Sequence, residues 1–163
     1  MTVVLSGMKM TIVKRVSRMG RFVNADEVFE AWTSGDFRRM LAARSAHTNP
    51  IDRHFLLQGL VKEAYRQRVD PEIRRICIET GLMHLAEFGT IAPTLRKDMG
   101  GSLPRVSSFA WLATVMAEDG KIDEAVRVCQ EAARLGADDG TQGGYLGRSE
   151  RLRKKHSKVK HSG

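Results

Sequence analysis

Apolar residues recur at intervals of three and four along most of the chain, the spacing that places side chains on one face of a helix. The clearest pattern covers two pairs of segments, 50–68 with 71–83 and 104–118 with 123–135. The apolar positions are Phe55, Leu56, Leu60, Val61 and Ala64; Ile73, Ile76, Cys77 and Met83; Phe109, Leu112, Ala113 and Met116; Ala125, Val128, Cys129, Ala132 and Leu135. The pattern predicts two helical hairpins, because a short turn between two helices makes them antiparallel.

Start and stop signals delimit these helices. Asn49-Pro50 and Asp70-Pro71 each place a capping side chain before a proline in the first turn. Gly120 is expected to turn the chain inside the second pair, and Gly136 to end its last helix. Residues 88–104 predict a longer irregular connection, because they contain breaker residues. The breakers are Gly89, Pro93, Gly100, Gly101 and Pro104, and Pro104 is expected to open the next helix.

Two shorter helices are predicted before the hairpins. Asn24-Ala-Asp-Glu27 has the form of a capping box, and apolar residues from Val28 to Trp32 follow it. Ser34-Gly-Asp36 breaks the helix, and a second short one begins at Phe37. This pair is either a degenerate first unit of a helical array or a cap over its open end. Residues 1–23 show no sustained helical or strand pattern, which predicts a flexible basic leader.

An eight-residue stretch occurs twice, and its two cysteines, Cys77 and Cys129, lie 52 residues apart. The identical positions are Glu72 and Glu124, Arg75 and Arg127, Cys77 and Cys129, and Glu79 and Glu131. Internal repeats of roughly this length are typical of helical arrays, in which each unit buries its apolar face against the next. We therefore expect both thiols, and the leucines Leu60 and Leu112, to face a shared interior.

The second hairpin resembles a tetratricopeptide repeat. The resemblance rests on Phe109-x-x-Leu112-Ala113-x-x-Met116-x-x-x-Gly120-x-Ile122-x-x-Ala125-x-x-x-Cys129-x-x-Ala132, where Gly120 matches the turn glycine of the family. Residues 57–80 are similar to a second, poorer copy. The 52-residue spacing exceeds the ordinary repeat of about 34 residues, so we expect such hairpins to be separated by an insertion.

The resemblance implies an all-α fold, a short α-solenoid of antiparallel hairpins with flexible basic termini. We expect a basic leader at 1–23, a helical-repeat domain at 24–147 and a basic C-terminal helix or tail at 148–163. The formal net charge of +8 belongs to the two ends. The leader carries five basic residues and no acidic one, and the tail carries seven basic residues and one acidic one. The basic character therefore describes the ends and not the folded body.

Composition narrows the class of protein. Apolar residues make up 42% of the chain, which fits a folded protein, and aromatic residues only 6%, which disfavours a base-stacking surface. No apolar run approaches the roughly 20 residues of a membrane helix, and the first residues lack the order of a secretory signal. A transit peptide is an alternative for the leader, since it has no acids. Cysteines without an export signal predict reduced thiols and a cytoplasmic protein with no membrane contact.

No catalytic, cofactor-binding or metal-binding residue is predicted. His84 follows Cys77 by seven residues, but Cys129 has no such partner, and no C-x-x-C motif is present. The glycine-rich stretch 138–148 has two interpretations. It is either a phosphate-cradling loop or a turn that redirects the chain into a last basic helix at 149–158, anchored by Tyr145 and Leu146. We favour the turn, because the stretch matches neither phosphate-loop motif.

The resemblance also implies a partner-binding face, because the first helices of such hairpins line a concave groove that holds a peptide. The face would carry Gln58, Lys62, Tyr65 and Arg66 from the first unit, and Ala110, Thr114, Ala117 and Glu118 from the second. Lys62, Tyr65 and Arg66 would receive an acidic or C-terminal segment through charge-assisted hydrogen bonds. The carboxylate clamp of the family also needs an asparagine beside its lysine, which is missing here. An ordinary solvated helix surface is the alternative.

These observations favour a protein–protein interaction module without catalytic activity, whose partner is a protein or peptide. The alternative is a nucleic-acid-associated accessory protein that uses its basic tails for non-specific phosphate contacts, with binding that weakens steeply in salt.

Overall fold

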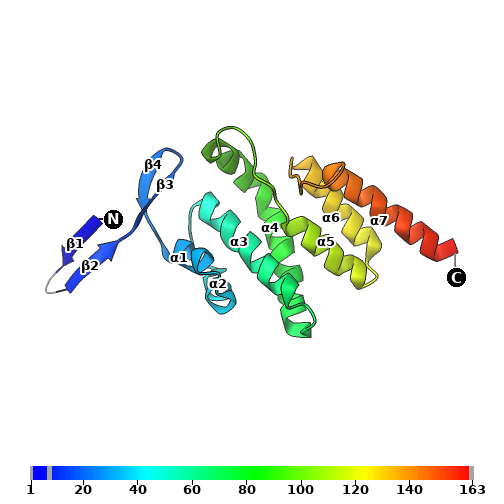
Figure 1. Ribbon diagram of the computed structural model, residues 1–163, viewed down its shortest axis with the longest axis horizontal. Coiled ribbons are helices and arrows are strands. Elements are labelled where there is room, and N and C mark those ends of the chain that lie inside the picture. Colours follow the sequence, from blue (N-terminus) through cyan, green and yellow to red (C-terminus); the bar gives the residue numbers. More distant parts are fainter. Residues whose placement is uncertain (1, 7–8, 162–163) are drawn as a thin grey trace.

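Seven helices and two β-hairpins form the described part of the chain (Figure 1). The computed structural model describes the backbone of residues 2–6 and 9–161 and the side chains of residues 13–159. The strands are β1 (Thr2–Ser6), β2 (Lys9–Val13), β3 (Arg15–Arg18) and β4 (Arg21–Asn24). The helices are α1 (Glu27–Ser34), α2 (Phe37–Ala43), α3 (Pro50–Arg66), α4 (Pro71–Asp98), α5 (Ser108–Glu118), α6 (Ile122–Arg134) and α7 (Gly144–His161). The fold is thus mostly helical, as predicted, with strands added at the N-terminal end.

The prediction that residues 1–23 lack a strand pattern is wrong. β1 pairs with β2 and β3 with β4, both antiparallel. The turn between β3 and β4 has Met19 at φ 54° and Gly20 at φ 75°, and two successive positive φ angles are what a tight type I′ hairpin turn requires. Residues 1, 7 and 8 of the predicted leader, and 162 and 163 of the predicted tail, lie outside the described residues.

The β3–β4 hairpin is attached to the helices through Asp52. The Arg18 guanidinium donates to the Asp52 carboxylate at 2.6 Å, and the Trp32 indole N–H donates to it at 3.0 Å. Burial raises the pKa of Asp52, but the hydrogen bonds from Arg18, Trp32 and Asn49 outweigh burial and hold that pKa below its usual value. The buried carboxylate therefore remains ionised and joins the hairpin, α1 and α3.

The short helices α1 and α2 follow the predicted break. Gly35 ends α1 in the left-handed conformation, with φ 69°. The predicted capping box at Asn24–Glu27 is wrong: Asp26 caps α1 by accepting from the Phe29 N–H at 2.8 Å. The two helices cover one side of α3, where Val28 and Met40 pack against Leu60 and its neighbours.

The start signals of α3 and α4 are confirmed, but the end of α4 is not where the sequence pattern placed it. Asn49 accepts from the Asp52 N–H, and Asp70 accepts from the Glu72 N–H. α4 continues through Gly89 and Pro93 to Asp98, so the irregular connection expected at 88–104 is wrong for residues 88–98 and confirmed for residues 99–104. The added turns bury Phe88, Ile91, Ala92 and Leu95, and this burial offsets the helix bond that proline removes.

Of the remaining helices, α6 begins within one residue of its predicted start, whereas the predicted starts of α5 at Pro104 and of the last helix at 149 are wrong. α5 begins at Ser108, four residues after Pro104, and Gly120 and Gly136 have φ angles of 79° and 83°, which confirms the turn and the stop. α7 begins at Gly144, so this helix crosses the predicted boundary between residues 147 and 148. Tyr145 is buried as expected, whereas the predicted anchoring role of Leu146 is wrong, because this side chain is 56% exposed.

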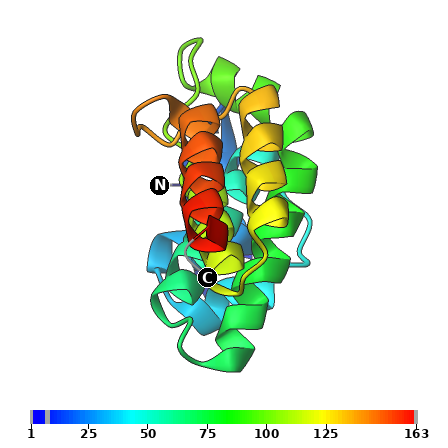
Figure 2. The same ribbon diagram turned by 90° about the vertical axis from the view of Figure 1, so that its right-hand side faces the viewer.

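The helices stack in chain order, each from α3 to α7 packing against the next, and α3 also contacts α5 (Figures 1 and 2). Leu60, Leu112, Cys77 and Cys129 are all fully buried, as predicted. They do not share one interior, however: Leu112 and Cys129 belong to one core cluster, Leu60 to a second and Cys77 to a third. The 52-residue spacing has two causes: α4 continues to Asp98, and an irregular connection follows it before α5 begins.

Candidate functional site

Two of the residues predicted for the partner-binding face, Gln58 and Tyr65, have side chains that contact other parts of the protein. The Gln58 side-chain oxygen accepts from the Ser107 N–H at 3.1 Å, so Gln58 joins α3 to the start of α5. Tyr65 stacks on Trp111 of α5, with ring centroids 6.1 Å apart. Lys62 and Arg66 are exposed on α3, and Arg66 forms an ion pair with Glu63, one helical turn earlier. The α3 part of this face therefore presents mainly its two cations to solvent.

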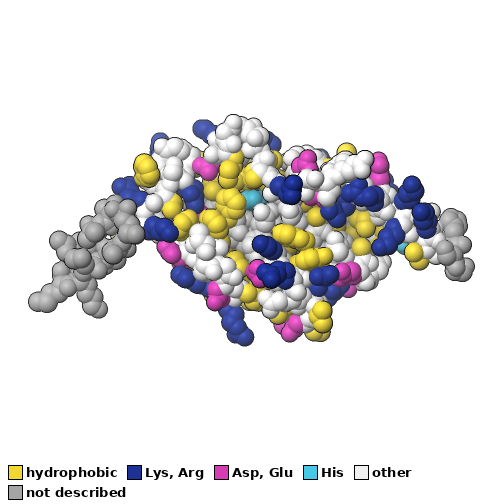
Figure 3. Space-filling model, in the orientation of Figure 1, with side chains coloured by type: hydrophobic (Ala, Val, Ile, Leu, Met, Phe, Trp, Pro, Cys, Tyr) yellow, Lys and Arg dark blue, Asp and Glu magenta, His cyan; other side chains and the backbone are white. Residues whose placement is uncertain are grey.

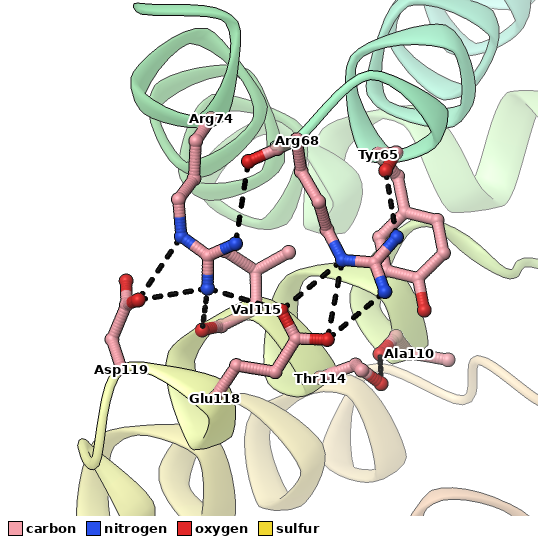
Figure 4. Close-up of polar contacts among 8 residues, drawn as sticks. All are labelled: Tyr65, Arg68, Arg74, Ala110, Thr114, Val115, Glu118 and Asp119. Carbon is pink, nitrogen blue, oxygen red and sulfur yellow. Dashed lines mark hydrogen bonds and ion pairs between the residues drawn. The ribbon is translucent and has the colours of Figure 1, made fainter. Parts of the chain in front are cut away.

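Glu118 belongs to a cluster of two arginines and two acids that joins the α3–α4 turn to the end of α5 (Figure 4). Arg68 donates to the Glu118 carboxylate at 3.0 Å, and its guanidinium lies 4.0 Å from the centroid of the Tyr65 ring. Arg74 donates to Glu118 at 3.0 Å and to Asp119 at 2.7 Å. The hydrogen bond from Arg68 lowers the pKa of Glu118, burial raises it slightly, and Arg74 lowers it again.

The arginines of this cluster were missed in the sequence. Glu118 and Asp119 lie at the C-terminal end of α5, where the helix dipole disfavours negative charge. Arg68 and Arg74, and not the helix dipole, therefore stabilise the charges of this pair. Arg68 and Arg74 lie about 45 to 50 residues away in sequence, and no local pattern indicates that they reach α5.

A groove opens between α5, the α5–α6 turn and the C-terminal half of α7. Its volume is about 670 Å³. We call it the α5–α7 groove, and its lining residues are Thr114, Ala117, Glu118, Gly120, Ile122, Leu152, Lys155, His156 and Val159. The start of α7 is fixed against the start of α5, because the Tyr145 hydroxyl donates to the Val106 carbonyl at 2.5 Å and accepts from the Ala110 N–H at 3.1 Å. Three of the predicted face residues, Thr114, Ala117 and Glu118, thus line this groove.

The α7 side of the groove is apolar toward the floor and basic at the rim. Leu152 and Val159 are seven residues apart, and Lys155 and His156 lie between them at helical spacing, so all four share one face of α7. Val159 is 66% exposed. Dark blue Lys and Arg side chains gather over α7 at the right of Figure 3. The groove therefore combines an uncovered apolar strip with positive charge.

Two buried histidines form the most unusual polar contact in the interior. His54 Nδ1 and His84 Nε2 lie 3.0 Å apart, and the second ring nitrogen of each histidine has no hydrogen-bond partner. Burial lowers the pKa of His54 to about 4, and burial, then His54 and Arg53, hold the pKa of His84 well below its usual value. Both rings are therefore neutral near pH 7. Among the described residues, no group of three or more His, Cys, Asp or Glu side chains could hold a metal ion.

The thiols and the glycine-rich stretch serve the fold. Burial raises the pKa of Cys77 and of Cys129 to about 11, so neither forms a reactive thiolate near neutral pH. Asp138 and Asp139 close the stretch by accepting from the N–H groups of Gly140 and Thr141. The interpretation as a turn that leads into α7 agrees with this geometry.

Comparison of the chain with protein-family models, with curated proteins and with solved structures gives no match. None of the helices in the described part of the chain has the length and apolar character that a bilayer crossing requires.

Proposed function

We propose that this protein is a non-catalytic interaction module of tetratricopeptide-like hairpins and that the α5–α7 groove receives a segment of another protein. The observation that carries the proposal is the apolar strip along the floor of this groove, which is formed by Ile122, Leu152 and Val159. Covering such a strip gains free energy because apolar surface leaves water. A volume of about 670 Å³ is within the range that admits a few side chains.

The packing of the helices supports the repeat-like part of the proposal. α3 packs on α4 and α5 on α6, and the first helices of the two pairs also contact each other. Repeat hairpins that stack in this way leave one side of their first helices open, and Thr114 of α5 lies on that side. We also propose a cytoplasmic location, because both cysteines are free thiols.

Site-specific photocrosslinking tests the proposal. A photoreactive amino acid replaces Val159 in the groove or, as the control, Met99, which caps α4 and is 40% exposed. α4 ends at the opposite end of the bundle from the α5–α6 turn (Figure 1). We expect a discrete crosslinked protein in host cells from position 159 and none from position 99. Equal labelling from both positions, or none from position 159, contradicts the proposed docking site.

A second candidate function is non-specific nucleic-acid binding, and one observation favours it. The segment 144–161 contains seven basic residues and a single acidic one. A helix of this charge attracts phosphates, and its binding would weaken steeply as salt is added. The apolar strip beside these charges is not explained by phosphate contacts, so we place protein binding first.

A further inference from the structure

We infer that the occupant of the α5–α7 groove is an acidic segment of a partner protein that also carries apolar side chains. This inference rests on the proposed function, since it names the chemistry of the partner at the same groove. Three features of the groove support it: the apolar floor, the basic rim and the neutralised acid on the opposite wall.

The floor selects apolar side chains. Ile122 and Leu152 are half-buried and Val159 is exposed, so the strip remains partly open to water. A partner that places leucine, isoleucine or phenylalanine there removes apolar surface on both sides from water. A partner segment with only charged side chains would leave this apolar surface in contact with water and would gain no binding free energy from covering it.

The rim selects negative charge. Lys155 lines the groove, and Arg151 lies four residues before it, on the same side of α7. Arg151 also donates to the Gln142 carbonyl at 2.8 Å, which fixes its position and leaves its charge in place. Acidic side chains of the partner at helical spacing would meet this row of positive charges.

The opposite wall does not repel an acidic partner. Among the residues whose side chains the structure describes, Glu118 is the only acidic one that lines the groove. Its charge is offset by Arg68 and Arg74, which lie 3.0 Å from its two carboxylate oxygens. The field in the groove is therefore set mainly by α7.

Two other occupants fit less well. A second copy of this chain that docks α7 against α7 would bring two rows of positive charges together, which is unfavourable. A nucleic acid would satisfy the rim through its phosphates, but it offers no aliphatic side chain to Leu152 and Val159. The acidic, apolar segment is the occupant that satisfies both parts of the groove.

Fluorescence anisotropy with designed peptides tests the inference on the full-length protein at physiological ionic strength. The first probe is an amphipathic peptide as long as α7, with leucines on one face and glutamates elsewhere. The second probe has lysines in place of the glutamates, the third has serines in place of the leucines, and the fourth is a single-stranded oligoribonucleotide of similar length. We expect clear binding of the first probe only.

Matched variants locate the binding. Lys155→Glu replaces an attraction with a repulsion and should weaken binding of the first probe about fivefold. Val159→Glu should weaken it similarly through the floor. The control Lys97→Glu, in the last turn of α4, should leave binding within about twofold. Circular dichroism confirms that each variant is folded.

The remaining outcomes separate the two proposals. Equal binding of the acidic and basic peptides, or binding unchanged by both groove variants, overturns the inference. Lys155-dependent binding of the oligoribonucleotide alone overturns it in favour of nucleic acid. If photocrosslinking at position 159 captures a protein whose crosslinked segment is not acidic, the proposed function stands and the inference on partner chemistry fails.

Discussion

His54 on α3 and His84 on α4 share one hydrogen bond, 3.0 Å long, in the fully buried interior. Each ring keeps one nitrogen without a partner, and phenylalanine rings surround the pair, with His84 and Phe109 centroids 5.0 Å apart. A protonated histidine in this position would lose its hydration and gain no counter-charge. The pair therefore makes the packing of the first hairpin sensitive to acid.

The free energy of unfolding should fall as pH decreases from about 6.5 toward 4. In this range the histidines bind protons in the unfolded chain but stay neutral in the folded protein. The pKa of His54 is about 4 in the folded protein and about 6.5 when unfolded. For His54 alone, this difference costs about 2 kcal/mol between about pH 7.5 and about pH 5. Urea unfolding at the two pH values measures the loss.

A double variant identifies the source of this pH dependence. His54→Phe with His84→Phe removes both titrating rings and should flatten the dependence of unfolding free energy on pH. His47→Gln, at an exposed histidine, should leave the dependence unchanged. An equally steep dependence in the double variant would assign the acid sensitivity to other groups.

Leu60→Ala and Leu112→Ala should each lower the free energy of unfolding by about 2–5 kcal/mol, because both side chains are fully buried and truncation leaves a cavity. Leu146→Ala is the control, since that side chain is mostly exposed, and it should change stability by less than about 0.5 kcal/mol. Chemical denaturation measures all three. Losses near zero for both buried leucines would contradict the proposed core.

Alanine substitutions at two glycines of α4 test how closely α4 approaches its neighbours. A Cβ at Gly81 would lie 3.1 Å from Leu112 side-chain atoms, whereas at Gly89 the nearest atom, of Leu135, lies at 3.5 Å. Both substitutions gain the same helix propensity, about 1 kcal/mol. Gly81→Ala should therefore unfold more easily than Gly89→Ala by about 1–3 kcal/mol, the cost of overpacking. Equal melting temperatures would mean that α4 and α5 lie farther apart.

Arg74 and Arg75 are adjacent in sequence, but Arg74 bonds to another helix and Arg75 bonds to residues of its own helix. Arg74 crosses to α5, where it donates to the Val115 carbonyl at 3.1 Å and to Asp119. Arg75 bonds only within α4, to Glu72 and Glu79, on an exposed surface. Arg74→Met should lower the free energy of unfolding by about 1–3 kcal/mol, whereas Arg75→Met should leave it nearly unchanged. Similar costs in thermal or urea unfolding would remove the structural role assigned to the cluster.

Local signals predicted much of this fold because they depend on few residues. Asn49-Pro50, Asp70-Pro71, Gly120 and Gly136 each satisfy a backbone requirement that is visible within four residues. Gly89 and Pro93 indicate a break in the helix, but α4 continues through both of them to Asp98. Phe88, Ile91, Ala92 and Leu95 continue the helical spacing across Pro93, and that pattern was the better guide.

Features that depend on distant contacts were not predictable from the pattern. Met19-Gly20 is a weak turn signal, and its hairpin is held by Arg18 on Asp52, which is 34 residues away. The spacing of His84 and Cys77 places both residues near one face of the same helix, but the hydrogen-bond partner of His84 is His54, on the preceding helix. Three of the eight residues predicted for the face, Thr114, Ala117 and Glu118, line the α5–α7 groove. The other wall of the groove comes from α7, which the repeat pattern does not include.

The most direct test compares two substitutions in binding to the protein captured by crosslinking at position 159. Thr114→Trp fills the α5–α7 groove without adding charge, and Lys62→Glu changes the exposed α3 part of the predicted face. Our account predicts that Thr114→Trp raises the dissociation constant about tenfold or more, a change of about 1.4 kcal/mol, while Lys62→Glu changes it less than about twofold. Unchanged affinity for Thr114→Trp, or a larger loss for Lys62→Glu, would contradict it.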